Sequence, residues 1–368
     1  MSTASFLSAK LSQMVPEPTH ELAGPVFVLG AGFSRAISTA MPLLKDLSAA
    51  VWERYVDRDN VPDDIAALAE KDIEEALSYL TQSKPWLRES EQLRHRALFL
   101  ELTQVVSAVI GSVEADVISA MATGSPSWIN DLIRYWHQRR CAVLTLNYDT
   151  LIERIGGEFR MPGDSELMAP CAPWIIYPPI LTNAAARSGS VMTSYPNPSF
   201  QLLKLHGSVN WFYSGRDTTY GETIYYIPPL GPEGFWHGGK IKDEQRKRAS
   251  VSDKYPFIVP PVFDKSVLLT HETVRSIWFK GSEALRAASR VIFIGYSLPK
   301  SDRTMLHFLR TSMNPMARLD IVAPPGELLV HYRANLAFPA AQITQPFGGV
   351  DCVRNLVASL AAEPIPKG

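Results

Sequence analysis

Four short apolar segments in this chain each end abruptly at a glycine turn or a polar motif, and this feature constrains the fold more than any other. The segments are residues 26–29, 142–146, 201–205 and 291–294, and the motifs that end them are Gly30-Ala31-Gly32, Asn147-Tyr148-Asp149, His206-Gly207-Ser208 and Gly295-Tyr296-Ser297. Continuous apolar runs of this length are typical of strands buried in a parallel sheet. The carboxyl ends of parallel strands share one edge, where α/β proteins bind ligands. We therefore predict an α/β protein with a mostly parallel sheet and a ligand site at that edge.

Between the first two strands the apolar spacing changes to that of helices. Apolar residues recur three or four positions apart from about residue 43 to about residue 140, which predicts a helical insertion. Helix and strand patterns alternate again after residue 270, with a strand at 319–322 and a last helix near 350–361. This alternation supports the α/β class.

Two other segments have no sustained period. Residues 155–200 contain seven prolines, and residues 212–262 mix aromatic, Gly and Pro residues with a hydrophilic stretch at 237–254. We predict irregular insertions at about 155–200 and 212–262, and we favour a solvated loop over a nucleic-acid contact for the hydrophilic stretch. The polar residues 1–22 are expected to form an N-terminal arm ahead of one domain at 23–368.

Composition excludes several classes of protein. With 36 Lys and Arg against 37 Asp and Glu, the formal charge is −1, so direct electrostatic binding of nucleic acid is not indicated. The three cysteines, Cys141, Cys171 and Cys352, are dispersed, which argues against a disulfide framework and a Cys-rich zinc site. No run of about 18 apolar residues suggests a membrane span, so we expect a cytoplasmic protein without membrane contact.

The first glycine turn allows two interpretations. Gly30-Ala31-Gly32-Phe33-Ser34 resembles a dinucleotide-binding turn, in which missing β-carbons let backbone N–H groups approach a pyrophosphate. Arg35 stands where the usual fingerprint has its third glycine, and a purely structural turn is an equal alternative. Ser34 and Arg35 could contact phosphate, or they could be a helix cap and a solvent-facing side chain.

Each polar motif, taken alone, has both a functional and a structural interpretation. His206 could act as a general base, with Gly207 leaving room beside its imidazole, or it could be a hydrogen-bonded structural residue. Asn147 and Asp149 could place an amide and a carboxylate in one pocket, although both residue types also stabilise turns. Trp211 could wall that pocket or be an ordinary core aromatic.

In combination, the motifs resemble those of the sirtuin superfamily. GAGFS with Met41-Pro42 downstream, TLNYD at 145–149, KLHGS at 204–208 and GYS at 295–297 occur in the family's order. The chain is most similar to bacterial SIR2-like proteins of antiphage defence, in which KLHGSVNW, a DIEEALSYL-type helix and a GYSLPKSD turn occur. The resemblance spans about residues 24–345 and is specific as a set.

The sequence also departs from the protein-deacylating sirtuins. Residues 209–290 contain no cysteine, so the four-cysteine structural zinc of those enzymes is excluded. Their Pro-x-Phe-Arg segment stands here as Pro42-Leu43-Leu44-Lys45, and the segment between Asn147 and His206 is longer than in deacylases. These differences weaken the case for a groove that binds acyl-lysine, but they leave the motifs of the NAD⁺-cleaving centre in place.

The resemblance therefore implies a Rossmann-like, SIR2-like fold that lacks the four-cysteine zinc-binding module, and an NAD⁺ glycohydrolase that uses NAD⁺ as substrate and no metal. By family likeness, Asn147 positions ribose or water, His206 is the base and Asp149 contacts the carboxamide. The residues implied for the pyrophosphate are Gly30, Ala31, Gly32 and Ser34, with Arg35 as a further phosphate candidate, and those near the adenosine ribose are Gly295 and Ser297.

Two alternatives remain open at this stage: a zinc-free NAD-dependent protein deacylase, and a non-catalytic sensor that binds NAD or ADP-ribose. The resemblance further implies an antiphage role in which the enzyme depletes NAD⁺ once activated. Because the region of resemblance covers most of the chain, little of this sequence is left for a sensor domain. We therefore expect control by a homo-oligomer or by a separate activating protein, such as an ATPase or a nucleic-acid-guided partner.

Overall fold

The structure is a computed structural model that describes residues 24–82, 84–121, 126–159, 171, 176–178, 199–214, 224–227, 251–259, 271–299 and 302–364. The arm predicted at 1–22 lies outside these residues. So do most of the segment at 155–200 and the greater part of the segment at 212–262.

The central sheet has six strands in the order β3-β2-β1-β7-β8-β9, and every neighbouring pair is parallel. The strands are β1 (Val26–Leu29), β2 (Ala142–Thr145), β3 (Gln201–Lys204), β7 (Arg290–Ile294), β8 (Arg318–Val322) and β9 (Ile343–Phe347). The predicted α/β class with a parallel, Rossmann-like sheet is confirmed. Strands β2 and β3 are added on one side of β1, and β7, β8 and β9 are added on the other side. The direction in which strands are added therefore reverses between β1 and β7.

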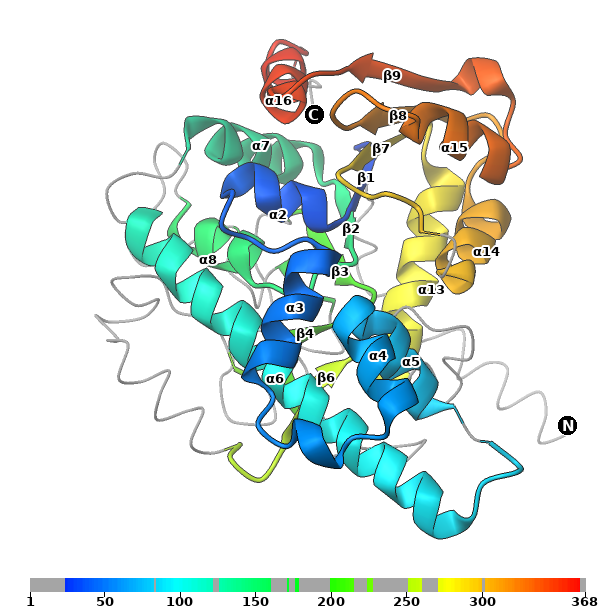
Figure 1. The fold of residues 1–368 in the computed structure, drawn as a ribbon. Helices are drawn as coiled ribbons and strands as arrows, with labels where there is room; N and C mark the ends of the chain where they lie inside the picture. Colours follow the sequence, from blue (N-terminus) through cyan, green and yellow to red (C-terminus); the bar gives the residue numbers. More distant parts are fainter. Residues whose placement is uncertain are drawn as a thin grey trace, which may run out of the picture.

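Helices cover both faces of this sheet (Figure 1). One side carries α2 (Ala31–Ile37), α7 (Ser127–Arg139), α8 (Leu151–Glu158) and α16 (Cys352–Ala361), and the other carries α13 (Glu272–Ala287), α14 (Arg303–Ser312) and α15 (Leu328–Asn335). Strands covered on both faces need apolar side chains at successive positions, which explains the continuous runs in the sequence. All four residues of β1 and of β2 are buried.

Between α2 and β2, every regular element in the described part of residues 43–140 is helical. These elements are α3 (Leu44–Arg54), the 3₁₀ turn η1 (Arg58–Asn60), α4 (Asp63–Lys71), α5 (Ile73–Thr81), α6 (Glu89–Met121) and α7. Helices α3 to α6 bury a core of their own, which also takes in Tyr148, Val209 and Ile258. This helical insertion is therefore packed directly against the segments that follow β2 and β3.

Helix α6 contains a stretch that is long and apolar enough to cross a membrane by length and composition alone. The expectation that no such stretch exists is therefore not met. Half of the stretch is buried inside the protein, however, and α6 packs along β4 (Gly207–Tyr213) and β6 (Tyr255–Ile258). Helices in the core of globular proteins have the same composition.

A second, antiparallel sheet has the order β5-β4-β6, with β5 at Tyr225–Tyr226. The chain passes from β3 of the first sheet to β4 of the second through only Leu205 and His206. Gly207 has a φ of +75°, and a β-carbon there would lie 2.1 Å from the carbonyl oxygen of Phe257. The close approach of β6, rather than space for an imidazole, therefore explains this glycine.

Candidate nucleotide site

The first and last glycine turns touch each other at the point where the strand order reverses. Gly30 N–H donates to the carbonyl of Ile294 at 3.0 Å, and Gly32 N–H donates to that of Gly295 at 3.0 Å. A β-carbon on Gly32 would lie 2.7 Å from the Gly295 α-carbon, and one on Gly295 would lie 2.4 Å from two backbone atoms of the α2 turn. The two backbones therefore pack too closely for a β-carbon, so glycine is required at Gly32 and Gly295 whether or not a ligand contacts them.

Asn147 joins the polar motif after β2 to this glycine turn. Its side-chain amide nitrogen donates to the Gly30 carbonyl at 3.0 Å and to Ser34 Oγ at 2.8 Å. Ser34 Oγ in turn donates to Asp149 Oδ2 at 2.6 Å, and Leu151 N–H donates to Asp149 Oδ1 at 3.2 Å. The structure therefore brings Gly30, Ser34, Asn147 and Asp149 into one hydrogen-bonded network.

The Asp149 carboxylate is buried and turned toward the protein. Burial raises its pKa, against the opposing effects of the nearby Lys204 ammonium and the Ser34 hydroxyl. Because both oxygens already accept hydrogen bonds within the chain, Asp149 orders the loop after β2 in this structure.

His206 lies at the junction of the two sheets, 3% exposed, with a carboxylate beside it. Its Nε2 is 3.8 Å from Oδ2 of Asp302, which is 1% exposed. The imidazole is also stacked with Trp278, at 6.4 Å between ring centroids, and lies 6.4 Å from the Tyr148 ring. Trp278 Nε1–H donates to the carbonyl of Leu205 at 3.0 Å, which fixes the indole against the turn that carries His206.

Asp302 is the functional candidate that the motifs did not identify. Its Oδ1 accepts the N–H of Met305 at 3.0 Å as the N-cap of α14, and its Oδ2 accepts the Tyr296 hydroxyl at 3.3 Å. An Asp before a helical pattern, at the end of GYSLPKSD, is a recognisable cap signal. Nothing in that local signal reveals the approach to His206.

The remaining predicted residues lie apart from these contacts. Arg35 donates to the carbonyl of Met41 at 3.0 Å and to Asp46 Oδ2 at 2.9 Å, so its guanidinium ties α2 to the start of α3. Ala31, the first residue of α2, and Ser297, three residues after the end of β7, are exposed. Trp211 is fully buried and packs edge-on against Tyr177 at 5.8 Å, as a core aromatic does.

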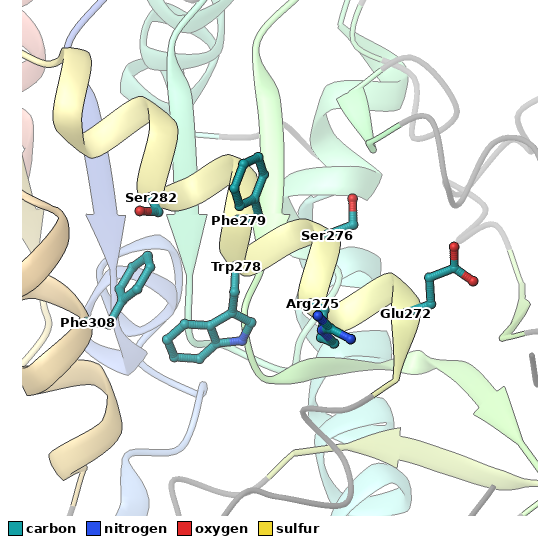
Figure 2. Close-up of a pocket in the computed structure, with 7 residues that line it drawn as sticks. All are labelled: Glu272, Arg275, Ser276, Trp278, Phe279, Ser282 and Phe308. Carbon is teal, nitrogen blue, oxygen red and sulfur yellow. The ribbon is translucent and has the colours of Figure 1, made fainter. Parts of the chain in front are cut away.

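An open hollow of about 730 Å³ lies on the outer face of α13 (Figure 2). Trp278 and Phe308 point toward one another at one side of it, with ring centroids 4.7 Å apart. The other lining residues are Glu272, Arg275, Ser276, Phe279 and Ser282. Trp278 therefore contributes both to this hollow and to the packing of His206.

No group of three or more His, Cys, Asp or Glu side chains that could hold a metal ion is found within the described ranges. The three cysteines are buried free thiols.

No protein-family profile and no curated protein matches this chain. Solved structures that are similar to this chain include SIR2 homologues. A SIR2 homologue in complex with NAD is 13% identical with a TM-score of 0.39, over 93% of this chain and 89% of that one. Sir2Tm bound to a propionylated peptide is 14% identical with a TM-score of 0.37, over 98% of both chains. Similarity at this level carries no argument about function, so the proposal below rests on the residues of this chain.

Proposed function

We propose that this protein cleaves NAD⁺ to nicotinamide and ADP-ribose. The observation that carries the proposal is the arrangement at the carboxyl edge of the parallel sheet. Asn147, after β2, is hydrogen-bonded to the glycine turn after β1, and His206, with Asp302 beside it, follows the neighbouring strand β3. The motifs that resemble the SIR2-like family thus converge where open α/β sheets bind nucleotides.

The reaction breaks the bond between the anomeric carbon of the nicotinamide ribose and the pyridinium nitrogen. The electron pair of that bond leaves with nicotinamide, which becomes neutral, and a water oxygen bonds to the carbon. The water proton passes to His206 and is then released to solvent. General-base catalysis of this kind contributes about 10²–10⁴ to a rate.

The contacts of the two side chains define their proposed roles. The amide nitrogen of Asn147 is committed to Gly30 and Ser34, so the amide oxygen is the atom that would orient a ribose hydroxyl or the attacking water. The Asp302 carboxylate would hold the His206 ring in place and stabilise the imidazolium that forms when His206 takes the proton. Gly30, Ala31, Gly32 and Ser34 remain the proposed pyrophosphate residues, and Gly295 and Ser297 those near the adenosine ribose.

The test is turnover of NAD⁺ by His206→Ala and Asn147→Ala, with folding checked by circular dichroism. Each substitution should lower kcat by about 10²–10⁴, equivalent to about 3–5 kcal/mol in the transition state. His307→Ala and Asn355→Ala change the same residue types at exposed positions and should leave kcat unchanged. Near-wild-type hydrolysis by a folded His206 or Asn147 variant would refute these roles.

Uncontrolled cleavage of NAD⁺ would deplete the cell that makes the enzyme. We therefore propose that a homo-oligomer or a separate activating protein controls the activity, in an antiphage role and in the cytoplasm. The assay is accordingly run over a range of protein concentrations, with oligomeric mass measured in parallel. Full activity per chain in a dilute monomer would contradict control by self-assembly.

A further inference from the structure

The peptide group between Asp149 and Thr150 is held from both sides. Its N–H, on Thr150, donates to Glu114 Oε1 at 2.9 Å, and its carbonyl, on Asp149, accepts a hydrogen bond from Lys204 Nζ. Glu114 comes from α6 and Lys204 from β3, and the two are 2% and 1% exposed. Two buried charged side chains thus fix one peptide of the loop that carries Asn147.

Glu114 makes its contacts with this loop and with the helix that follows it. Besides the Thr150 N–H, its Oε1 accepts the Thr150 hydroxyl and Arg154 Nε–H, the latter at 3.2 Å. A carboxylate buried in the apolar part of a long helix is costly unless it is paired. Its partners, Thr150 and Arg154, belong to the N-cap and first turn of α8, directly after Asp149.

A second carboxylate of the helical insertion holds the residue on the other side of Asp149. Glu74 Oε1, on α5, accepts the Tyr148 hydroxyl at 3.0 Å. The Tyr148 carbonyl accepts Val209 N–H at 3.0 Å and Ser208 Oγ–H at 3.2 Å. Two carboxylates of the helical insertion therefore hold this loop: Glu74 binds Tyr148, and Glu114 binds Thr150.

We propose that Glu114 is a positioning residue, which acts with Lys204 to set the conformation of loop 147–150 and so the placement of Asn147 on NAD⁺. This inference rests on the proposed function. It assigns the helical insertion a part in the reaction, because movement of α6 is transmitted through Glu114 to the peptide next to Asp149. A cap that only stabilised α8 would alter stability and leave kcat unchanged.

The experiment compares Glu114→Ala and Glu114→Gln with Asp320→Asn. Asp320 is a fully buried carboxylate on β8, paired with Arg290 and Arg318, and two strands lie between β8 and β2. It therefore controls for the general loss of a buried ion pair. Two measurements are made on each folded variant: steady-state kinetics with NAD⁺, and hydrogen–deuterium exchange of peptides that span residues 147–151.

Glu114→Ala should lower kcat about 100-fold while KM changes less than about 3-fold, because a small misplacement of a reacting group costs about this much. Glu114→Gln keeps the size and one oxygen acceptor and should lose only about 3- to 10-fold. In Glu114→Ala the Thr150 amide should exchange at least about 10-fold faster. Asp320→Asn should keep kcat within about 2-fold and leave exchange at 147–151 unchanged.

Folded Glu114 variants with wild-type kcat and wild-type exchange at 147–151 would overturn the proposal. An equal fall of kcat in Asp320→Asn would also overturn it, since the effect would then be one of general stability. If Glu114→Ala does not fold, Glu114→Gln decides by the same criteria. If Glu114→Ala speeds exchange at 147–151 but the wild type leaves NAD⁺ intact at every protein concentration and with every candidate activator, the role of Glu114 in ordering the loop stands and the proposed function is refuted.

Discussion

The contact between the two glycine turns gives a prediction whose size follows from the structure. Gly295 has a φ of +61°, and a β-carbon there would lie 2.4 Å from Gly32 C and from Phe33 N. In Gly295→Ala the left-handed backbone costs about 1–3 kcal/mol, and separating the two backbones adds about 1–3 kcal/mol as overpacking does. We expect the free energy of unfolding to fall by about 2–6 kcal/mol.

Urea unfolding followed by circular dichroism measures this loss. With an m-value of about 3 kcal/mol/M, the midpoint should fall by about 0.7–2 M. The matched control is Gly111→Ala on α6, where a β-carbon would meet nothing within 4 Å. Alanine should stabilise the helix there by up to about 1 kcal/mol. A Gly295→Ala protein that unfolds at the wild-type midpoint would refute the close packing of the two turns.

Two further predictions concern the carboxylates of the site. Asp302→Asn should lower kcat about 10–10³-fold with little change in KM, because the imidazolium of His206 loses its charged partner. The control variant Asp72→Asn, at the N-cap of α5, should leave kcat unchanged in the same steady-state assay. Equal kcat for the two variants would contradict the pairing of Asp302 with His206. Burial raises the pKa of Asp149, so the folded state binds the Asp149 proton more tightly than the unfolded state does. The stabilisation that comes from this tighter proton binding is fully present below about pH 4 and is lost as the pH rises through the folded-state pKa. Asp149→Asn should therefore compare more favourably with wild type at pH 7.5 than at pH 4.5 in urea unfolding, and the opposite trend would show that Lys204 outweighs burial.

The strands that carry the candidate site could be predicted because their signal is local. The apolar runs that became β1, β2, β3 and β7 are continuous and end at glycine or polar residues, as buried parallel strands do. Edge strand β9 gave no such signal, because Ile343–Phe347 is largely half-buried and contains Pro346. The second sheet was also missed, since its strands lie within or beside segments with no sustained period.

The contacts that order the site could not be predicted, because each depends on residues far apart in the chain. Asp302 has the sequence pattern of a helix cap, and its approach to His206 arises only when the start of α14 is brought near the turn that follows β3. Glu114 lies on the buried side of α6 together with Ile110 and Val117, but the sequence of the helix does not reveal that its partners are Thr150 and Arg154. Gly207 suggests space for an imidazole, whereas its cause is the Phe257 carbonyl of β6.

The most direct test of the central claim is the identity of the products formed from NAD⁺, with and without an acylated peptide. Purified protein, alone and with candidate activators, is incubated with NAD⁺ and the products are separated by chromatography and identified by mass spectrometry. The account predicts nicotinamide and ADP-ribose in a 1:1 ratio without peptide, and turnover at least about 100-fold slower in His206→Ala. O-acyl-ADP-ribose formed only when the peptide is present would instead identify a deacylase, and binding of NAD⁺ without turnover under every condition would identify a sensor.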